Sequence, residues 1–226
     1  MISQGRLDIA IGAGWNKPEY DAIGLPFDPT AVRQARLAES LTVIKKCLAG
    51  ESFSFSGEFY RITDYTGEAS VQRPHPPVFI GGGGRRTLEL AGREADIVGL
   101  APRILRTGLD AHSLTLEATR EKIGWVRAAA GDRLDEIEFN TYPSGWPPVL
   151  TDDLSGEVAK VVASLEKRTG TALTEQQVLD SPHLFIGSAD RLAEKFLALR
   201  EELGISSFLL GSVGELEPVL GKLAGS

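Results

Sequence analysis

A run of four glycines and two arginines is the segment of this chain best suited to chemistry. Gly81, Gly82, Gly83, Gly84, Arg85 and Arg86 follow an apolar run, residues 77–80, and precede a stretch with helical periodicity, residues 87–92. Glycine lets backbone N–H groups approach a ligand closely, and the N–H groups that open a helix attract anions. Guanidinium groups add positive charge that suits phosphate. The pattern predicts a cradle for the phosphate of a cofactor, while a flexible turn with solvated arginines accounts for the glycines alone equally well.

Strand and helix patterns alternate along the chain, and the elements that they predict position the glycine loop. Five strand candidates begin at Leu7, Val78, Asp96, Glu136 and Ile205. Helical patterns cover residues 30–48, 86–93, 112–130, 156–168, 174–179, 188–203 and 214–223, with Ser188 as an N-cap. We also expect a hairpin over residues 53–62 and a loop over residues 15–28, which are rich in glycine and proline.

This alternation predicts an α/β fold with a parallel sheet and right-handed crossovers. No linker-like composition interrupts it, so we expect one domain over residues 1–226. An open, doubly wound sheet fits five strands without strain, whereas a closed eightfold barrel needs eight.

Composition excludes several classes of function. The 226 residues carry a formal net charge of -7 and have no basic stripe, which argues against nucleic-acid binding. No stretch is long enough to span a membrane, and the N-terminus lacks the apolar core of a signal peptide. Cys47 is the only cysteine, so no intrachain disulfide forms and we expect a cytoplasmic protein. His75, His112 and His183 lack metal-ligand spacing, and we expect structural roles for them and no metal site.

The order of the motifs resembles that of the bacterial-luciferase-like flavin and deazaflavin oxidoreductases and monooxygenases, whose fold is a (β/α)8 TIM barrel. The matching segments are SQGRLDIAIGAGWN (residues 3–16), GLPF (24–27), FSGEFY (55–60), QRPHPPVFIGGGG (72–84), AD (95–96), SPHLFIGS (181–188) and LGIS (203–206). In the family, the segment that resembles residues 3–14 is the fourth barrel strand. The resemblance therefore implies a partial barrel of about five parallel strands, without the first three.

The resemblance also implies a cofactor, either FMN or coenzyme F420, and hydride transfer to or from a small organic substrate. By resemblance, Gly12, Ala13 and Gly14 lie against the cofactor ring, although the residues alone are equally well explained by a strand-to-loop turn. The glycines at 81–84 and Arg85 match the phosphate loop, and Gly99, Leu100 and Ala101 match a strand end that lines the cofactor's tail. No catalytic residue is carried over, because the segments that supply polar groups near the ring have no counterpart here.

Aromatic residues follow two of the strands and form candidate walls of a substrate pocket. Trp15 follows the first strand, and Tyr142 and Trp146 follow the fourth. They either line an apolar substrate site or cover the mouth of the fold.

Two questions of assembly and function stay open at this point. An open parallel sheet exposes edges, so we expect a homodimer or a separate partner chain to cover the open side, and a shortened closed barrel is a third option. The alternative function is a redox-inactive member of the family that acts as a binding module or as a non-redox enzyme on a bulky apolar molecule.

Overall fold

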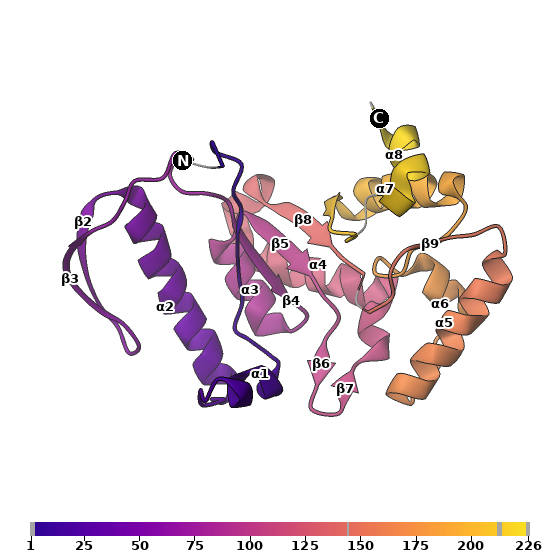
Figure 1. Cartoon of the computed structure of the whole chain (residues 1–226), viewed down its shortest axis with the longest axis horizontal. Coiled ribbons are helices and arrows are strands. Elements are labelled where there is room, and N and C mark those ends of the chain that lie inside the picture. The colour runs from indigo at the N-terminus through magenta and orange to yellow at the C-terminus, as the bar shows by residue number, and fades with distance from the viewer. Residues whose placement is uncertain (1–2, 144, 212–213, 225–226) are drawn as a thin grey trace. The chain divides into compact units, whose positions relative to one another are not determined.

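Five parallel strands form one hydrogen-bonded sheet in the computed structural model, which describes residues 3–143, 145–211 and 214–224 (Figure 1). The strand order is β1-β4-β5-β8-β11. The strands are β1 (Ile9–Ile11), β4 (Val78–Gly82), β5 (Ile97–Leu100), β8 (Glu138–Thr141) and β11 (Ile205–Phe208). Four of them lie within the predicted strand segments, and β4 extends two residues beyond the predicted apolar run at 77–80, over Gly81 and Gly82. The predicted α/β class is confirmed.

Helices follow most of the strands, and local signals set their ends. Ser188 accepts a hydrogen bond from the Arg191 N–H and caps α7, as predicted, and Thr174 forms a capping box at α6. Gly50 ends α2 with a positive φ of 78°. The helices are α1 (Lys17–Ala22), α2 (Thr30–Ala49), α3 (Arg85–Glu94), α4 (Leu116–Ala130), α5 (Leu154–Thr169), α6 (Glu175–Asp180), α7 (Ala189–Leu203) and α8 (Glu217–Leu223).

The shorter elements show where the sequence patterns were insufficient. The predicted hairpin is confirmed as β2 (Ser52–Ser56) and β3 (Arg61–Thr66). The prediction of a loop over residues 15–28 is wrong, because α1 lies within it. The remaining short elements are β6 (Ile104–Leu105), β7 (Gly108–Leu109), β9 (Val149–Leu150), β10 (Ile186–Gly187) and the 3₁₀ helices η1 (Ala111–Leu114), η2 (Gly131–Glu136) and η3 (Gly214–Leu216).

The start of α1 has a physical explanation that the prediction of a loop, made from the glycine and proline content, did not consider. Pro18 occupies the first turn of α1, where its missing N–H costs nothing. The side chain of Asn16 donates to Glu19 at 2.7 Å, and Lys17 pairs with Asp21 one turn later at 2.7 Å. A proline in the first turn therefore opened a helix here.

Contacts divide the chain into two compact units. The N-terminal unit is Met1–Ile80 with Glu94–Asp96, and the C-terminal unit is Gly81–Arg93 with Ile97–Ser226. In the N-terminal unit, the carboxylate of Glu39 on α2 accepts N–H groups from residues 58–60, which join β2 to β3. The hairpin accordingly lies alongside α2 (Figure 1). The single domain over residues 1–226 stays a prediction.

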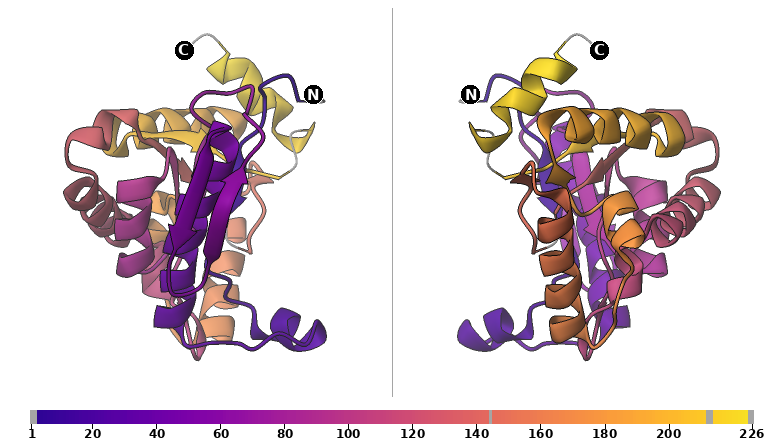
Figure 2. Two further views of the ribbon diagram at one scale, coloured as in Figure 1. Left: turned by 90° about the vertical axis from the view of Figure 1, so that its left-hand side faces the viewer. Right: turned by 90° about the vertical axis from the view of Figure 1, so that its right-hand side faces the viewer.

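The C-terminal unit has closely packed helices and a second apolar cluster. A Cβ on Gly92 of α3 would lie 2.6 Å from the Val126 carbonyl oxygen of α4, so a glycine is required for this approach. Helix α8 packs against α7 (Figure 2), where Lys222 and Asp190 form an ion pair at 2.5 Å. Buried side chains of α5 and α6 and of residues 173–186 form the second cluster, which includes Val158, Leu165 and Leu184.

Candidate functional site

The glycine loop joins β4 to α3 in the C-terminal unit. The Gly82 carbonyl oxygen accepts the Ala101 N–H at 3.0 Å, which ties the loop to the end of β5. The Gly84 carbonyl oxygen accepts the Leu88 N–H at 3.1 Å and so closes the first turn of α3. The first N–H groups of a helix have no acceptor within the helix, so this end of α3 carries the positive end of the helix dipole. The order of strand, glycine turn and helix is as predicted, but Gly81 and Gly82 belong to β4, so only Gly83 and Gly84 form the turn.

The glycines of the loop serve different purposes. A Cβ on Gly83 would lie 2.4 Å from the Pro102 carbonyl oxygen and 2.7 Å from the Arg103 nitrogen, so Gly83 allows one backbone to approach another. A Cβ on Gly82 would lie 2.7 Å from Cγ2 of Thr87. A Cβ on Gly84 would meet nothing within 4 Å. Gly84 therefore faces open space at the start of a ten-residue helix, which fits a phosphate group.

Both arginines of the motif are exposed. Nε of Arg85 donates to Oε1 of Glu89, one turn along α3, at 2.7 Å, and the Arg85 side chain is 68% exposed. The charge of Arg85 is thus shared with a carboxylate of its own helix. Its role as a phosphate partner stays a prediction, and the open N-terminus of α3 is the stronger anion-attracting feature.

The predicted tail-lining residues lie at the end of β5. Leu100 is fully buried, Gly99 is buried and Ala101 is half-buried. Nζ of Lys122, on α4, donates to the carbonyl oxygens of Ala101 at 2.8 Å and Ser113 at 2.6 Å. Burial lowers the pKa of Lys122 to about 8.

A second buried polar cluster lies at the end of β8. The ring of His183 contacts Oγ1 of Thr141 at 3.1 Å and Oγ1 of Thr119 at 3.5 Å. Burial lowers the pKa of His183 to about 3, and the nearby charges of Lys122 and Lys195 act in the same direction. His183 is therefore neutral near pH 7 and holds two elements together rather than transferring protons.

Asn140 leaves one buried polar atom without a partner among the described residues. Its Nδ2 donates to Oγ of Ser207 on β11 at 2.8 Å, whereas its Oδ1 accepts nothing. The register places Asn140 beside Gly99 of β5. Such an atom is a candidate for a bound water.

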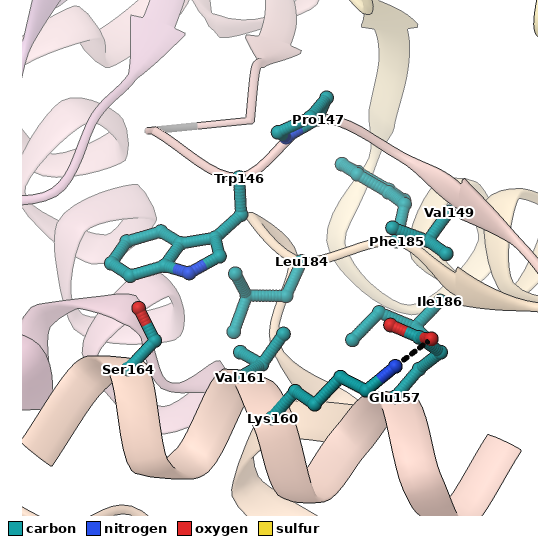
Figure 3. Close-up of a pocket in the computed structure, with 10 residues that line it drawn as sticks. All are labelled: Trp146, Pro147, Val149, Glu157, Lys160, Val161, Ser164, Leu184, Phe185 and Ile186. Carbon is teal, nitrogen blue, oxygen red and sulfur yellow. Dashed lines mark hydrogen bonds and ion pairs between the residues drawn. The ribbon is translucent and has the colours of Figure 1, made fainter.

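Trp146 lines a mostly apolar pocket of about 240 Å³ in the C-terminal unit (Figure 3). One face of its ring lies 4.2 Å from the Arg168 guanidinium carbon, which fixes the indole over α5. Glu157 and Lys160 form an ion pair at 2.6 Å at the edge of the pocket. The other lining residues are Pro147, Val149, Val161, Ser164, Leu184, Phe185 and Ile186.

Tyr142 does not line this pocket. Burial raises the pKa of its phenol, and its carbonyl oxygen lies 3.5 Å from Nδ1 of His183. Of the two aromatic residues predicted after the fourth strand, Trp146 lines this apolar pocket and Tyr142 does not.

The predicted ring-contact residues belong to the N-terminal unit. Gly12 and Ala13 line a smaller pocket of about 120 Å³ that also contains Arg33. Nη1 of the buried Arg33 donates to the carbonyl oxygens of Ala13, at 3.2 Å, and of Gly14. Gly14 has a φ of +71°, a conformation that requires glycine in a tight turn. Trp15 is 70% exposed and does not line the pocket.

Sequence reasoning missed Lys122 as a residue of the site. Its signal was present, because the buried positions of α4 follow the helical period and Lys122 falls among them with Thr119, Ile123 and Val126. A lysine in an apolar stripe indicates that its ammonium group has a buried partner.

The five-stranded sheet and the helices that follow its strands place the protein in the class of α/β folds. Within that class, the chain belongs to the luciferase-like monooxygenase family, whose sequence model matches residues 1–139. The family predicted from the sequence is confirmed.

Two enzymes illustrate the similarity in sequence. The chain is 39% identical over 97 residues to an FMNH2-dependent dimethylsulfone monooxygenase of Pseudomonas putida, which is 42% of this chain and 27% of that enzyme. It is 35% identical over 141 residues to an F420-dependent glucose-6-phosphate dehydrogenase of Nakamurella multipartita, which is 59% of this chain and 37% of that enzyme. The matched region thus spans well under half of either relative.

Solved structures with the same fold match nearly the whole chain. An F420-dependent tetrahydromethanopterin reductase of Methanopyrus kandleri matches with a TM-score of 0.67 and 20% identity, covering 96% of this chain and 72% of that one. An F420-dependent secondary alcohol dehydrogenase in complex with an F420-acetone adduct matches with a TM-score of 0.63 and 18% identity, covering 98% and 70%. At these identities the likeness shows the fold alone.

No helix in the described part of the chain combines the length and apolar character needed to cross a membrane. Nor do the described residues contain a group of three or more histidine, cysteine, aspartate or glutamate side chains placed to hold a metal ion.

Proposed function

We propose that this protein is an oxidoreductase that binds FMN or coenzyme F420 and supports hydride transfer to or from a small organic substrate. The observation that carries the proposal is the open face of Gly84 at the N-terminus of α3. Relatives named as FMNH2-dependent and F420-dependent enzymes support it. When bound, the cofactor supplies the redox chemistry, and the protein binds and orients it.

The residues of the chain then have distinct tasks in this proposal. Gly84 admits the phosphate to the first N–H groups of α3, and Gly83 lets the loop lie against the Pro102 backbone. Arg85 and Arg86 add positive charge at the surface of the site.

The substrate in this proposal has an apolar portion that binds beside Trp146. The pocket there is lined mainly by aliphatic and aromatic side chains, and the ion pair between Glu157 and Lys160 lies at its edge (Figure 3). A site of this composition selects by shape and burial of apolar surface.

The phosphate site is tested with the variant Gly84→Asp. A side chain at this position meets open space, and aspartate is a favourable residue directly before a helix, so the variant should fold at least as well as the parent protein. Its carboxylate occupies and repels the anion site. We expect the affinity for FMN or F420, measured by titrating fluorescence or absorbance, to fall by more than about tenfold.

Gly84→Asn is the matched control, because it has the same shape and capping ability without the charge. It should bind more tightly than Gly84→Asp. Equal binding by Gly84→Asp and the parent protein would show that the phosphate does not lie at this loop.

The second candidate function is a binding module for an apolar molecule, and the observation that favours it is the pocket beside Trp146. Neither cofactor then binds at tens of micromolar. Octanol, used as an apolar probe, should displace water beside Trp146 and shift the tryptophan emission of the parent protein to shorter wavelength, and this response should be lost in Trp146→Phe.

A further inference from the structure

Lys122 is a buried cation whose ammonium group faces backbone rather than a carboxylate. The residue is 2% exposed, and its Nζ donates hydrogen bonds to the carbonyl oxygens of Ala101 and Ser113, at 2.8 and 2.6 Å. Burying a lysine is costly unless its donors are satisfied, so these two oxygens fix the position of the ammonium group.

The Ala101 peptide connects Lys122 to the glycine loop. The Ala101 carbonyl accepts from Lys122, and the Ala101 N–H donates to the Gly82 carbonyl oxygen at 3.0 Å. The next residue, Pro102, has its carbonyl oxygen 2.4 Å from where a Cβ of Gly83 would lie. The ammonium group therefore holds the segment against which two of the loop glycines rest.

The second anchor of Lys122 holds the same segment from its other end. Ser113 lies within the 3₁₀ helix η1, and its Oγ accepts the Arg103 N–H at 2.7 Å while donating to the Asp110 carbonyl oxygen at 2.6 Å. Arg103 in turn pairs with Asp110 at 2.6 Å. Both ends of the turn formed by residues 101–113 thus meet at one ammonium group.

We propose that Lys122 is a positioning residue for the glycine loop, acting through the Ala101 peptide, and that it controls the affinity of the phosphate site without touching the ligand. The identity of the ligand in this inference rests on the proposed function. The effect of Lys122 on the position of the loop does not depend on it. A charged ammonium group makes stronger hydrogen bonds to carbonyls than a neutral amine does.

The charge of Lys122 is poised to change near neutral pH. Burial lowers its pKa to about 8; Asp110 and Glu121 raise it, and Arg103 lowers it. Neutral His183 also lies within the electrostatic reach of Lys122. As the pH rises through about 8 the ammonium group loses its proton, so the hold on Ala101 weakens on the alkaline side.

The test compares the parent protein, Lys122→Met and Lys195→Met. Lys195 is a matched control, because Nζ of Lys195 also donates to two carbonyl oxygens, of Leu179 at 2.6 Å and Leu184 at 2.7 Å, which lie outside the loop and the 101–113 turn. Two quantities are measured: dissociation constants for FMN and for F420 between pH 6.5 and 9.5, and protection of the Ala101 amide from hydrogen exchange without ligand.

We expect Lys122→Met to bind about tenfold more weakly at pH 7 and to lose the alkaline weakening that the parent protein shows. Its Ala101 amide should exchange at least about tenfold faster, because the partner of that amide is Gly82 in the loop. Lys195→Met should match the parent protein in the ratio of pH 7 to pH 9.5 affinities and in Ala101 exchange.

Unchanged affinity and unchanged Ala101 protection in Lys122→Met would overturn the inference. Failure of the parent protein to bind either cofactor would instead overturn the proposed function, and Ala101 exchange would still decide the role of Lys122. If Lys122→Met does not fold, the parent protein decides alone: Ala101 protection that is flat between pH 7 and 9.5 overturns the inference, and protection that falls supports it.

Discussion

At the scale of single residues, burial decides which titratable groups matter. His183 is fully buried and hydrogen-bonded as a neutral ring to Thr141, so protonation would place an unpaired charge in the core. Its pKa is lowered to about 3 in the folded protein from the ordinary 6.5. Between these values the unfolded chain binds a proton that the folded protein does not, so stability falls as the pH falls below about 6.5.

The difference in the pKa of His183 between the folded and unfolded states predicts that the free energy of unfolding falls in acid. From pH 7 to pH 4.5 the parent protein should lose about 2.5 kcal/mol of unfolding free energy through His183. His183→Leu should be less stable at pH 7 but lose less on acidification. Urea unfolding at both pH values measures the difference. His112→Leu, at an exposed histidine, is the control and should keep the full acid loss.

Sequence patterns predicted the position of a residue where the conformation of its own backbone segment sets its role. The motif at residues 81–84 lies where β4 gives way to α3, and this position could be predicted from the apolar run before it and the helical period after it. The separate reasons for Gly83 and Gly84 could not be predicted, because only the fold shows that Gly83 lies against Pro102 and that Gly84 faces open space. Asn140 was missed for the same reason, because its partner is set by tertiary packing. The place of Lys122 in the buried stripe of α4 could have been predicted, but its two carbonyl partners could not.

At the scale of elements, the β2–β3 hairpin depends on one carboxylate of α2. Glu39 accepts the N–H groups of Glu58 at 2.8 Å, Phe59 at 3.0 Å and Tyr60 at 3.3 Å. Desolvation opposes the charge of Glu39, but these three donors outweigh it and hold the pKa of Glu39 below its ordinary value. The connection between the strands is thereby fixed to the helix.

Removing this carboxylate should loosen the hairpin while the rest of the fold persists. We expect Glu39→Ala to increase amide exchange within residues 52–66 by at least about tenfold, with little change in β5 and β8. Glu39→Gln keeps one acceptor oxygen and should lie between Glu39→Ala and the parent protein. Equal exchange in all three proteins would show that side-chain packing holds the hairpin instead.

Elements with strong periodicity were predictable and short ones were not. The five sheet strands and the long helices α2, α4, α5 and α7 lie where their periodicity placed them. The two-residue strands β9 and β10 pair only because the fold brings residues 149–150 and 186–187 together. Helix α1 was missed because Pro18 was interpreted as a loop residue rather than as a residue in the first turn of a helix.

At the scale of the whole molecule, the exposed apolar residues of one segment are the feature that a partner would cover. Trp15 and Ile23 are each 70% exposed and Leu25 is 53% exposed, all within eleven residues that contain α1. Clustered exposed apolar side chains of this size are typical of interaction surfaces. Strands β1 and β11 also end the strand order, and sheet edges recruit further chains.

We therefore expect this protein to form a homodimer that buries residues 15–25. Sedimentation equilibrium at micromolar concentration should give about twice the chain mass of 24.3 kDa. Ile23→Lys places a charge in the buried surface and should weaken association by more than about tenfold. Leu220→Lys, at an exposed residue of α8, is the control and should leave association unchanged. A parent protein that stays monomeric at this concentration excludes the homodimer. Its dissociation constant for self-association would then lie well above micromolar, which is typical of incidental contacts rather than of a specific interface.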